Sequence, residues 1–443
     1  MSEQVTIIMP VYNPGKYLRS CLDSLLAQTM DDFRIIAIDD GSTDNSWDVL
    51  QEYAAQDARL LPQQNPYNIG AARTRNIGLQ LARGEYVVIL DADDYFEPDY
   101  LECMWTACKE NDLDVAICDY WQRDESTGKE QKNFINRNFL NIVDRPFYWQ
   151  DIKKYVLMIF PHNPFTRMYR KTFLDEFDLN FQDLSNANDL YFAELSLICA
   201  HRIQHISKPL VHYRYNTGNQ ISTFRSKKAE CICLAFIKLN QILHRINVYD
   251  EVKETFISHS IESIYAYINI LDSKDRVCFL QYLQNEFYPR INFVNLACDS
   301  FISDYIYQKW RGMNSSDNNC ELFKDSVFKE NTYKSFFDEV KNRKIKIAHW
   351  GYGILGQEFI EVSKRLNCPV LECYDSDSIR WNYCLDIPVK SFRDRDVSIS
   401  LIVVTNSTFI DDILKVTRNY RLPLFDFESF LKYGICFSEC LLK

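Results

Sequence analysis

Residues 85–100, with the sequence EYVVILDADDYFEPDY, constrain the fold of this chain most. The run 86–90 is apolar, β-branched and aromatic, which is typical of a strand buried on both faces. It ends abruptly in Asp91, Ala92, Asp93 and Asp94. Open α/β sheets bind ligands at the carboxyl ends of their strands, and two carboxylates around one small residue suit Mg²⁺ or Mn²⁺. A solvated acidic turn is the structural alternative.

Strands and helices alternate on the amino-terminal side of this segment. Apolar runs at 5–9 and 33–39 predict strands, and residues 16–28 and 69–82 have the spacing of amphipathic helices. Such alternation predicts an α/β fold in which parallel strands are covered by helices on both faces.

After the acidic segment the pattern is less regular. Residues 123–138 are polar and predict an irregular excursion, and residues 188–200 predict a helix. Weaker patterns predict a helix at 149–159 and strands at 114–118, 202–206 and 210–215.

The length of the chain and the changes in its residue pattern predict three segments. A chain of 443 residues exceeds one ordinary core. We expect an α/β domain over 1–222, a helical middle segment over 223–344 and a small α/β domain over 345–443.

Charge and cysteine usage exclude several classes of protein. A formal net charge of −11 argues against a protein whose main partner is nucleic acid. We see neither a signal peptide nor an apolar run of the roughly 18 residues that span a bilayer. The 15 cysteines include no CxxC pair, which favours reduced thiols and a cytoplasmic location.

Several ordered motifs carry a resemblance to a known family. They are IIMPVYNPGKYLRSCLDSLLAQT, IDDGSTDNS, NIGAARTRNIGL and LDADDYFEPDYLE, followed by NPFTRMYRKTFL, NDLYFAELSL and KPLVHYRYN. Over about the first 220 residues the chain resembles the family 2 glycosyltransferases, which are inverting enzymes of the GT-A fold. The resemblance implies a mixed sheet of the GT-A type that binds a nucleotide-sugar.

The resemblance also implies a set of donor-binding residues. The donor would be a nucleotide-diphosphate sugar, most simply a UDP-sugar. Pro10, Val11 and Tyr12 would line the base pocket, and Asp40 would hydrogen-bond the nucleobase. Arg75 and Asn76 would face the phosphates, and Asp91 and Ala92 would lie on the ribose side. For Asp40, the start of the Gly41 turn and a helix cap are structural alternatives.

The metal and the catalytic base follow from the same resemblance. Asp93 would ligate Mn²⁺ or Mg²⁺, His212 would complete the metal shell, and Asp189 would be the catalytic base. The family usually has Glu-Asp where this chain has Asn188 and Asp189. A satisfied structural histidine is the alternative for His212, and an acid in a first helical turn is also favoured by the helix dipole. Asp183 is the substitute if Asp189 is out of register.

The chemistry of such a transfer needs these two kinds of acid. A divalent cation neutralises the charge that develops on the departing diphosphate. A separate carboxylate removes the proton of the acceptor hydroxyl, and a single displacement inverts the anomeric centre.

The last part of the chain contains a second motif. Gly351, Gly353 and Gly356 form a GxGxxG pattern between a predicted strand and a predicted helix, and Asp375 ends the next predicted strand. This pattern predicts a Rossmann-like domain. The glycines would serve either nucleotide binding or close packing of the helix on the strand.

The prediction is therefore a glycosyltransferase that elongates a surface glycan or a lipid-linked acceptor. A homo-oligomer and peripheral contact with the inner face of the plasma membrane stay open. A sugar nucleotidyltransferase would need a Gly-rich loop with a basic residue near the first strand. This chain has PVYNPGK there, with a single lysine, which disfavours that enzyme class. A carbohydrate-binding or nucleotide-sugar-binding scaffold with a non-catalytic transferase domain is the remaining alternative.

Overall fold

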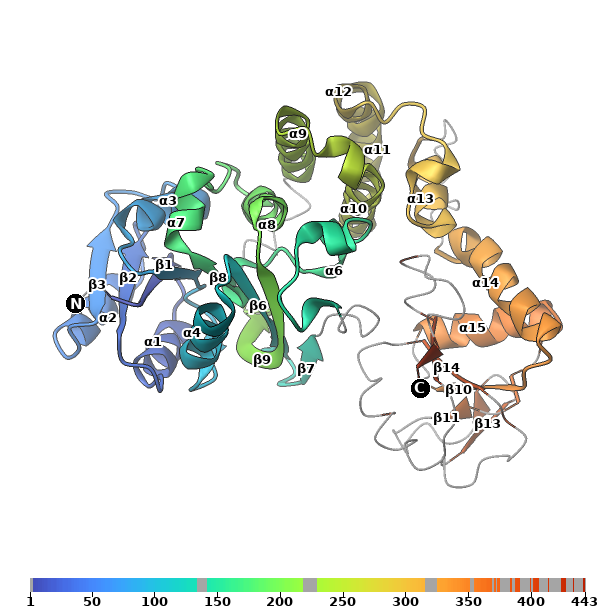
Figure 1. The fold of residues 1–443 in the computed structure, drawn as a ribbon, viewed down its shortest axis with the longest axis horizontal. Coiled ribbons are helices and arrows are strands. Elements are labelled where there is room, and N and C mark those ends of the chain that lie inside the picture. The colour runs from blue at the N-terminus through green and yellow to red at the C-terminus, as the bar shows by residue number, and fades with distance from the viewer. Residues whose placement is uncertain are drawn as a thin grey trace. The chain divides into compact units, whose positions relative to one another are not determined.

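The structure, a computed structural model, describes residues 3–133, 142–217, 229–314 and 325–350 continuously. Beyond them it describes residues 354–368 and short pieces between 370 and 442. The chain divides into two compact units, residues 1–294 and residues 295–443 (Figure 1).

The first unit is built on a nine-stranded sheet. Its strand order is β3-β2-β1-β4-β8-β6-β9-β5, and β7 pairs with β6. The strands are β1 (Val5–Val11), β2 (Phe33–Asp39), β3 (Leu60–Gln64), β4 (Tyr86–Ile89), β5 (Tyr95–Phe96), β6 (Val115–Asp124), β7 (Glu130–Asn133), β8 (Arg167–Arg170) and β9 (Ile203–Tyr215).

Parallel and antiparallel pairs share this sheet. Strands β3, β2, β1 and β4 are parallel neighbours, whereas β8 runs antiparallel to both β4 and β6. The mixed α/β sheet expected from the sequence is thereby confirmed.

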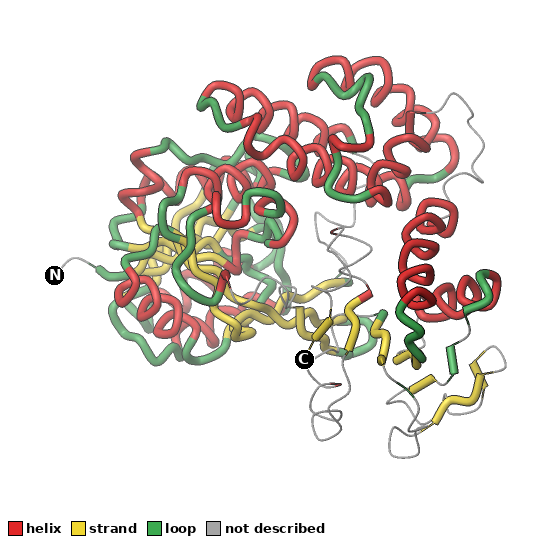
Figure 2. Tube along the Cα trace, turned by 45° about the vertical axis from the view of Figure 1, so that its right-hand side comes forward, coloured by secondary structure: helices red, strands yellow, loops and turns green. Residues whose placement is uncertain are grey.

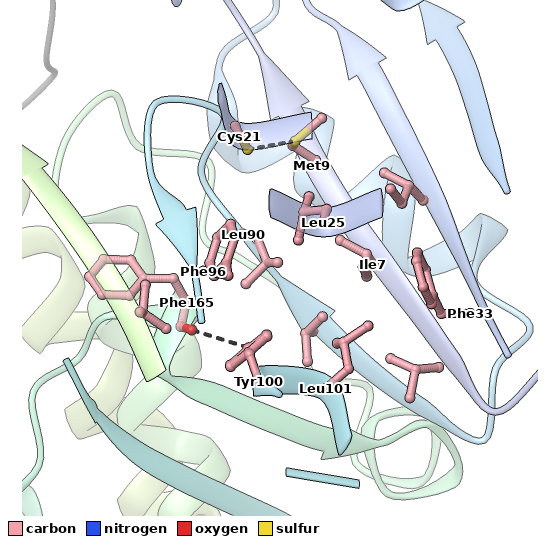
Figure 3. Close-up of a cluster of buried hydrophobic side chains, with 14 of the residues drawn as sticks. Ile7, Met9, Cys21, Leu25, Phe33, Leu90, Phe96, Tyr100, Leu101 and Phe165 are labelled. Atoms are coloured by element: carbon pink, nitrogen blue, oxygen red, sulfur yellow. Dashed lines mark hydrogen bonds between the residues drawn. The ribbon is translucent and has the colours of Figure 1, made fainter. Parts of the chain in front are cut away.

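Helices cover both faces of the parallel part. One face carries α1 (Tyr17–Leu26), α2 (Ser46–Ala54) and α4 (Tyr100–Asn111), which pack on alternate residues of β1 such as Ile7 and Met9. Figure 3 shows this core, where the thiol of Cys21 lies 3.6 Å from the sulfur of Met9. Because strand residues alternate between faces, the intervening side chains of β1 meet the other layer.

That other layer begins with α3 (Ala71–Leu81), which lies very close to β1. A Cβ atom at Gly78 would stand 2.2 Å from Cγ2 of Ile8, so any other residue here would force Ile8 to move. The close approach fixes α3, and with it the side chain of Arg75, against the carboxyl end of the sheet.

One pair of strands differs from the prediction. Residues 202–206 and 210–215 form a single strand, β9, and β6 continues well past residue 118. The register of this parallel pair shifts at Asp119, which stands opposite Pro209. A bulge tolerates a proline because no ladder hydrogen bond is needed there, so the proline does not end the strand. The polar residues 123–133, expected to be irregular, form a hairpin of β6 with β7.

The predicted helix at 149–159 is also different. It consists of two short segments, the 3₁₀ helix Trp149–Ile152 and α6 (Val156–Ile159), with a turn between them. Both segments bury their apolar side chains, so the helical spacing of the sequence is met by two separate turns.

Further helices complete the first unit. They are α7 (Lys171–Glu176), α8 (Asn188–Cys199), α9 (Glu230–Arg245), α10 (Tyr249–Ile270), α11 (Ser273–Tyr282), a π-helical turn at Leu283–Phe287 and α12 (Tyr288–Ile291). Figure 2 draws the helices in red and the strands in yellow. Helix α8 contacts α9, and α6 contacts both α8 and α10. Within the first unit, α9 and α10 therefore pack directly on the helices of the sheet domain. No helix in the described part of the chain is both long and apolar enough to cross a membrane.

The second unit contains a smaller sheet. Its strand order is β12-β13-β11-β10-β14-β15-β16. The five central strands β13, β11, β10, β14 and β15 run parallel to their neighbours. The elements are α13 (Asp304–Asn314), α14 (Asp325–Asn342), β10 (Ile347–Trp350), α15 (Ile354–Arg365), β11 (Cys373–Tyr374), β12 (Tyr383–Cys384), β13 (Ile387–Lys390), β14 (Leu401–Val404), β15 (Leu424–Asp426) and β16 (Leu441–Leu442).

A buried histidine in this sheet predicts acid sensitivity. His349 lies within β10, its Nε2 is 3.0 Å from the hydroxyl of Thr405, and burial lowers its pKa to about 3. Because the pKa of His349 is lower in the folded than in the unfolded protein, its full contribution to the free energy of unfolding is present above the unfolded pKa of about 6.5. That contribution is lost as pH falls towards 3. Between pH 7 and pH 5 we expect a loss of about 2 kcal/mol.

Urea unfolding of the full chain at several pH values measures this loss. His349→Gln removes the titrating group, so its unfolding free energy should change less between pH 7 and 5 than that of the unmodified protein. The matched control is His201→Gln, at an exposed histidine, which should keep the full acid dependence. An identical acid dependence in His349→Gln would contradict the assignment.

Candidate active site

The loops that follow β1, β2 and β4 meet at one edge of the sheet. The backbone N–H of Asp40 donates to the carbonyl of Val11 at 2.7 Å, and that of Leu90 donates to Ile8 at 2.9 Å. These bonds bring the three candidate segments that begin at Pro10, Asp40 and Asp91 to neighbouring strand ends, as the sequence predicts.

Asp40 is buried and organises the loop that leads into α3. Its carboxylate accepts hydrogen bonds from the side chain of Asn65 at 2.8 Å and from the backbone N–H groups of Ile69 at 3.0 Å and Gly70 at 2.9 Å. Gly70 caps α3 with a φ of +94°, a conformation that favours glycine. Since a carboxylate has about four acceptor positions, one remains for a further donor.

Two exposed tyrosines flank the turn at Gly41. Tyr12 is 50% exposed and lies between Val11, which is buried, and Asn13, whose side chain accepts from the backbone of Thr43. Tyr67 is 68% exposed, and its backbone lies so close to Gly41 that a Cβ there would be 2.9 Å from the Tyr67 Cα. Sequence reasoning selected Tyr12 and missed Tyr67, because the contact with Gly41 depends on the path of the loop.

The acidic loop presents its carboxylates in different environments. Asp91 and Asp93 are partly exposed, whereas Ala92 and Asp94 are buried. One oxygen of Asp94 accepts from the backbone N–H of Arg214 at 2.8 Å, and the other accepts no hydrogen bond from the residues that the structure describes. Burial, together with the charges of Asp93 and Asp91, raises the pKa of Asp94 well above its usual range.

Arg214, at the end of β9, supports this loop. Its guanidinium donates to the carbonyl of Asp93 at 2.6 Å and to the hydroxyl of Ser20 at 3.1 Å. It also lies over the ring of Tyr95, 4.4 Å from the ring centroid. Arg214 thus fixes the backbone of the acidic loop.

Arg75 connects the acidic loop with the start of α8. Its guanidinium donates at 2.8 Å to the carboxylate of Asp91 and at 2.8 Å to the side-chain oxygen of Asn188, and it lies over the ring of Phe181. Arg75 is almost fully buried, so these contacts are shielded from solvent.

Asn76, the neighbour of Arg75, is engaged by the protein itself. Its amide donates to the carbonyl of Phe181 at 2.9 Å and accepts from the N–H of Phe181 at 2.8 Å. This pairing ties α3 to the segment before α8, and it is a structural role that the sequence did not reveal.

Asp189 stands in the first turn of α8 with its carboxylate partly exposed. Within the described residues, hydrogen bonds to this carboxylate are absent. Burial lowers the pKa of His162, and the nearby charge of Asp189 opposes that shift. The alternative acid, Asp183, is exposed and forms an ion pair with Arg73 at 2.5 Å.

His212 lies between two carboxylates. Its Nδ1 is 2.8 Å from Glu130, its Nε2 is 3.0 Å from Glu97, and its ring stacks on Tyr95 with the centroids 4.1 Å apart. Both ring nitrogens are engaged in this state, which supports the structural alternative named for this histidine.

The glycine motif of the second unit is described only in part. Gly351, Gly353 and Asp375 lie outside the described residues, and Gly356 is buried within α15. Their predicted role in nucleotide binding stays a prediction.

Comparison with solved structures defines the class of fold. The structure of S. aureus TarS residues 1–349 in complex with UDP matches with a TM-score of 0.55 at 19% identity, over 75% of this chain and 92% of that chain. The same protein in complex with UDP-GlcNAc matches with a TM-score of 0.50. These matches establish a shared α/β fold.

Sequence comparison defines the family. The sequence profile of glycosyl transferase family 2 matches residues 6–177. EpsH of Bacillus subtilis is 32% identical over 267 residues, which cover 57% of this chain and 74% of EpsH. Glycosyltransferase GlyG of Streptococcus pneumoniae is 28% identical over 295 residues, or 61% of this chain and 94% of GlyG. The chain belongs to the family 2 glycosyltransferases, and the enzyme class predicted from its motifs is confirmed.

Proposed function

We propose that this glycosyltransferase uses a divalent cation and a nucleotide-diphosphate sugar, with UDP as the nucleotide, and that it inverts the anomeric centre. The acceptor would be a glycan or a lipid-linked intermediate of a surface polysaccharide. A UDP donor is supported by the UDP and UDP-GlcNAc complexes of TarS.

The observation that carries this proposal is the bridge made by Arg75. Its two hydrogen bonds, to Asp91 and to Asn188, bring the acidic loop and the first turn of α8 to the two ends of one guanidinium. Transfer requires a site for the leaving diphosphate beside a separate base. These two segments supply one acid cluster and one carboxylate, that of Asp189, without a hydrogen bond from the described residues.

The residues of the acidic loop fit a hard divalent cation. Asp93 offers a partly exposed carboxylate, and Asp94 adds a buried oxygen without a hydrogen bond from the described residues. Oxygen donors of this kind suit Mg²⁺ and Mn²⁺. When bound, the cation would neutralise charge on the departing diphosphate. Asp93 is the proposed ligand. His212 could ligate the cation only after one of its ring nitrogens had left its carboxylate partner.

Other residues would bind and orient the two substrates. We assign the exposed ring of Tyr12, with Pro10 and Val11, to the nucleobase, and the remaining acceptor position of Asp40 to a base N–H. Asp91 and Ala92 would face the ribose, and Arg75 and Asn76 would hold the loops around the phosphates. Asp189 would remove the proton of the acceptor hydroxyl, a step worth about 10²–10⁴-fold.

For the second unit we infer a Rossmann-like domain. The order β13-β11-β10-β14-β15 of its parallel strands is that of strands 3-2-1-4-5 in such folds. We propose that this domain begins at residue 345 and that a helical segment over 223–344 precedes it. We also propose that the protein forms a homo-oligomer or contacts a membrane surface.

A thermal-shift panel tests the function. Full-length protein is heated with UDP, GDP, UMP and a set of UDP-sugars and GDP-sugars, each with and without Mn²⁺. We expect UDP compounds to raise Tm only with Mn²⁺, by an amount that corresponds to about 2.7 kcal/mol at 100 times Kd. UMP is the control, because it lacks the diphosphate. A GDP-specific shift would overturn the UDP assignment, and equal shifts without Mn²⁺ would overturn the metal.

A further inference from the structure

Three side chains that the proposed transfer does not use form a cluster with the composition of a metal site. His162 precedes the 3₁₀ helix Pro164–Thr166, Glu194 lies on α8 and His259 lies on α10. Their imidazole nitrogens and carboxylate oxygens all lie within 4.8 Å of one another. Nε2 of His259 is 3.5 Å from a carboxylate oxygen of Glu194.

Three polar atoms of this cluster, on Glu194 and His259, are buried and lack hydrogen bonds from the described residues. Glu194 is fully buried, and both of its carboxylate oxygens lack a hydrogen-bond partner in the described part of the chain. Nε2 of His259 is in the same situation, with the residue 9% exposed. Buried carboxylates are normally paired, hydrogen-bonded or bound to a metal, because burying an unsatisfied charge is costly.

The neighbouring cation does not satisfy Glu194. The guanidinium of Arg167 is buried nearby, but its Nη atoms donate to the carbonyl oxygens of Ala193 at 2.6 Å and Pro161 at 2.8 Å. The ion pair with His259 is the one partner that the described residues offer the carboxylate, and at 3.5 Å it is longer than a charge-assisted hydrogen bond.

We propose that His162, Glu194 and His259 bind a transition-metal dication, for which Zn²⁺ is the best chemical fit. Two imidazoles and one carboxylate form a ligand set used by zinc, and they leave a position for water. Imidazole nitrogen also separates this site chemically from the oxygen ligands of the acidic loop, which favour Mg²⁺ or Mn²⁺.

The site joins three segments that the sequence keeps far apart. A bound ion fixes α8 to α10 and to the loop at His162, and α8 carries Asp189 in its first turn. The ion would therefore clamp these three segments together. This inference is independent of the proposed function.

Metal titration of the full-length protein tests the site. Protein stripped with a chelator is titrated with Co²⁺, whose visible bands report imidazole ligation, and then with Zn²⁺ in competition with a chelating dye. We expect one Zn²⁺ per chain that displaces Co²⁺. In His162→Asn and His259→Asn, the affinity should fall at least about 100-fold, while the far-UV circular dichroism of the metal-free proteins stays that of the unmodified chain.

Two controls make the result decisive. His244→Asn changes an exposed histidine on α9, and Asp93→Asn changes the acidic loop, so both should keep the zinc site. If the unmodified protein binds no stoichiometric Zn²⁺, or if His244→Asn loses it equally, the cluster is a plain histidine–glutamate ion pair. Should the histidine variants fail to fold, the Co²⁺ spectrum and stoichiometry of the unmodified protein decide alone.

Discussion

Asp189→Asn is expected to retain donor binding and to lower the rate of sugar transfer by about 10²–10⁴-fold. The carboxylate is partly exposed and carries no hydrogen bond from the described residues, so asparagine fits the site without breaking a contact. Asparagine cannot accept the proton of the acceptor hydroxyl. Transfer is measured with saturating donor, and donor affinity is measured by calorimetry on the same preparation.

The matched control for Asp189→Asn is Asp183→Asn. Asp183 is the other acid of this segment, but it is exposed and pairs with Arg73, so its loss should change transfer by less than a few fold. Loss of donor binding in Asp189→Asn would assign Asp189 to the donor site. A larger effect of Asp183→Asn would place the base there.

Asp93→Ala is expected to abolish the effect of Mn²⁺ on donor binding and to slow transfer by at least about 100-fold. The reason is that the partly exposed carboxylate of Asp93 is the proposed ligand of the cation that neutralises charge on the departing diphosphate. The measurement is donor affinity and transfer rate across a Mn²⁺ titration.

For Asp93→Ala the control is Asp99→Asn, an acid of the same segment that pairs with Lys208. That variant should keep the full response to Mn²⁺. An unchanged Mn²⁺ response in Asp93→Ala would refute the metal assignment, whereas loss of folding would appear as a changed circular dichroism spectrum.

Local patterns predicted the parallel half of the first sheet because each of its strands is a compact apolar run. They predicted β9 as two strands, since Pro209 looks like the end of a strand when its bulged partner at Asp119 is unknown. Nor did they predict the hairpin of β6 and β7, whose polar residues face solvent and so lack an apolar signal. Long-range register is absent from any short window of sequence.

The candidate site shows the same division. Sequence motifs selected Asp91, Asp93 and Asp189, and the structure places the loop of the first two one guanidinium away from the helix of the third. The motifs could not show that Asn76 pairs with the backbone of Phe181 or that His212 lies between two glutamates. These partners come from distant parts of the chain, and only the fold brings them together.

The zinc cluster had no sequence signal either. Its residues lie on a loop and two helices that are far apart in the chain, without the short ligand spacing by which metal motifs are recognised.

Arg75 has a consequence that reaches beyond its own contacts. Because this guanidinium is buried, the loss of its bond to Asp91 or to Asn188 is costly. A ligand that displaces Asp91 therefore alters the free energy of the α8 start, and thermodynamic reciprocity requires that a change at that helix alter the affinity for the ligand by the same factor. A ligand at the acidic loop and a ligand at the start of α8 would then be coupled through one shared guanidinium.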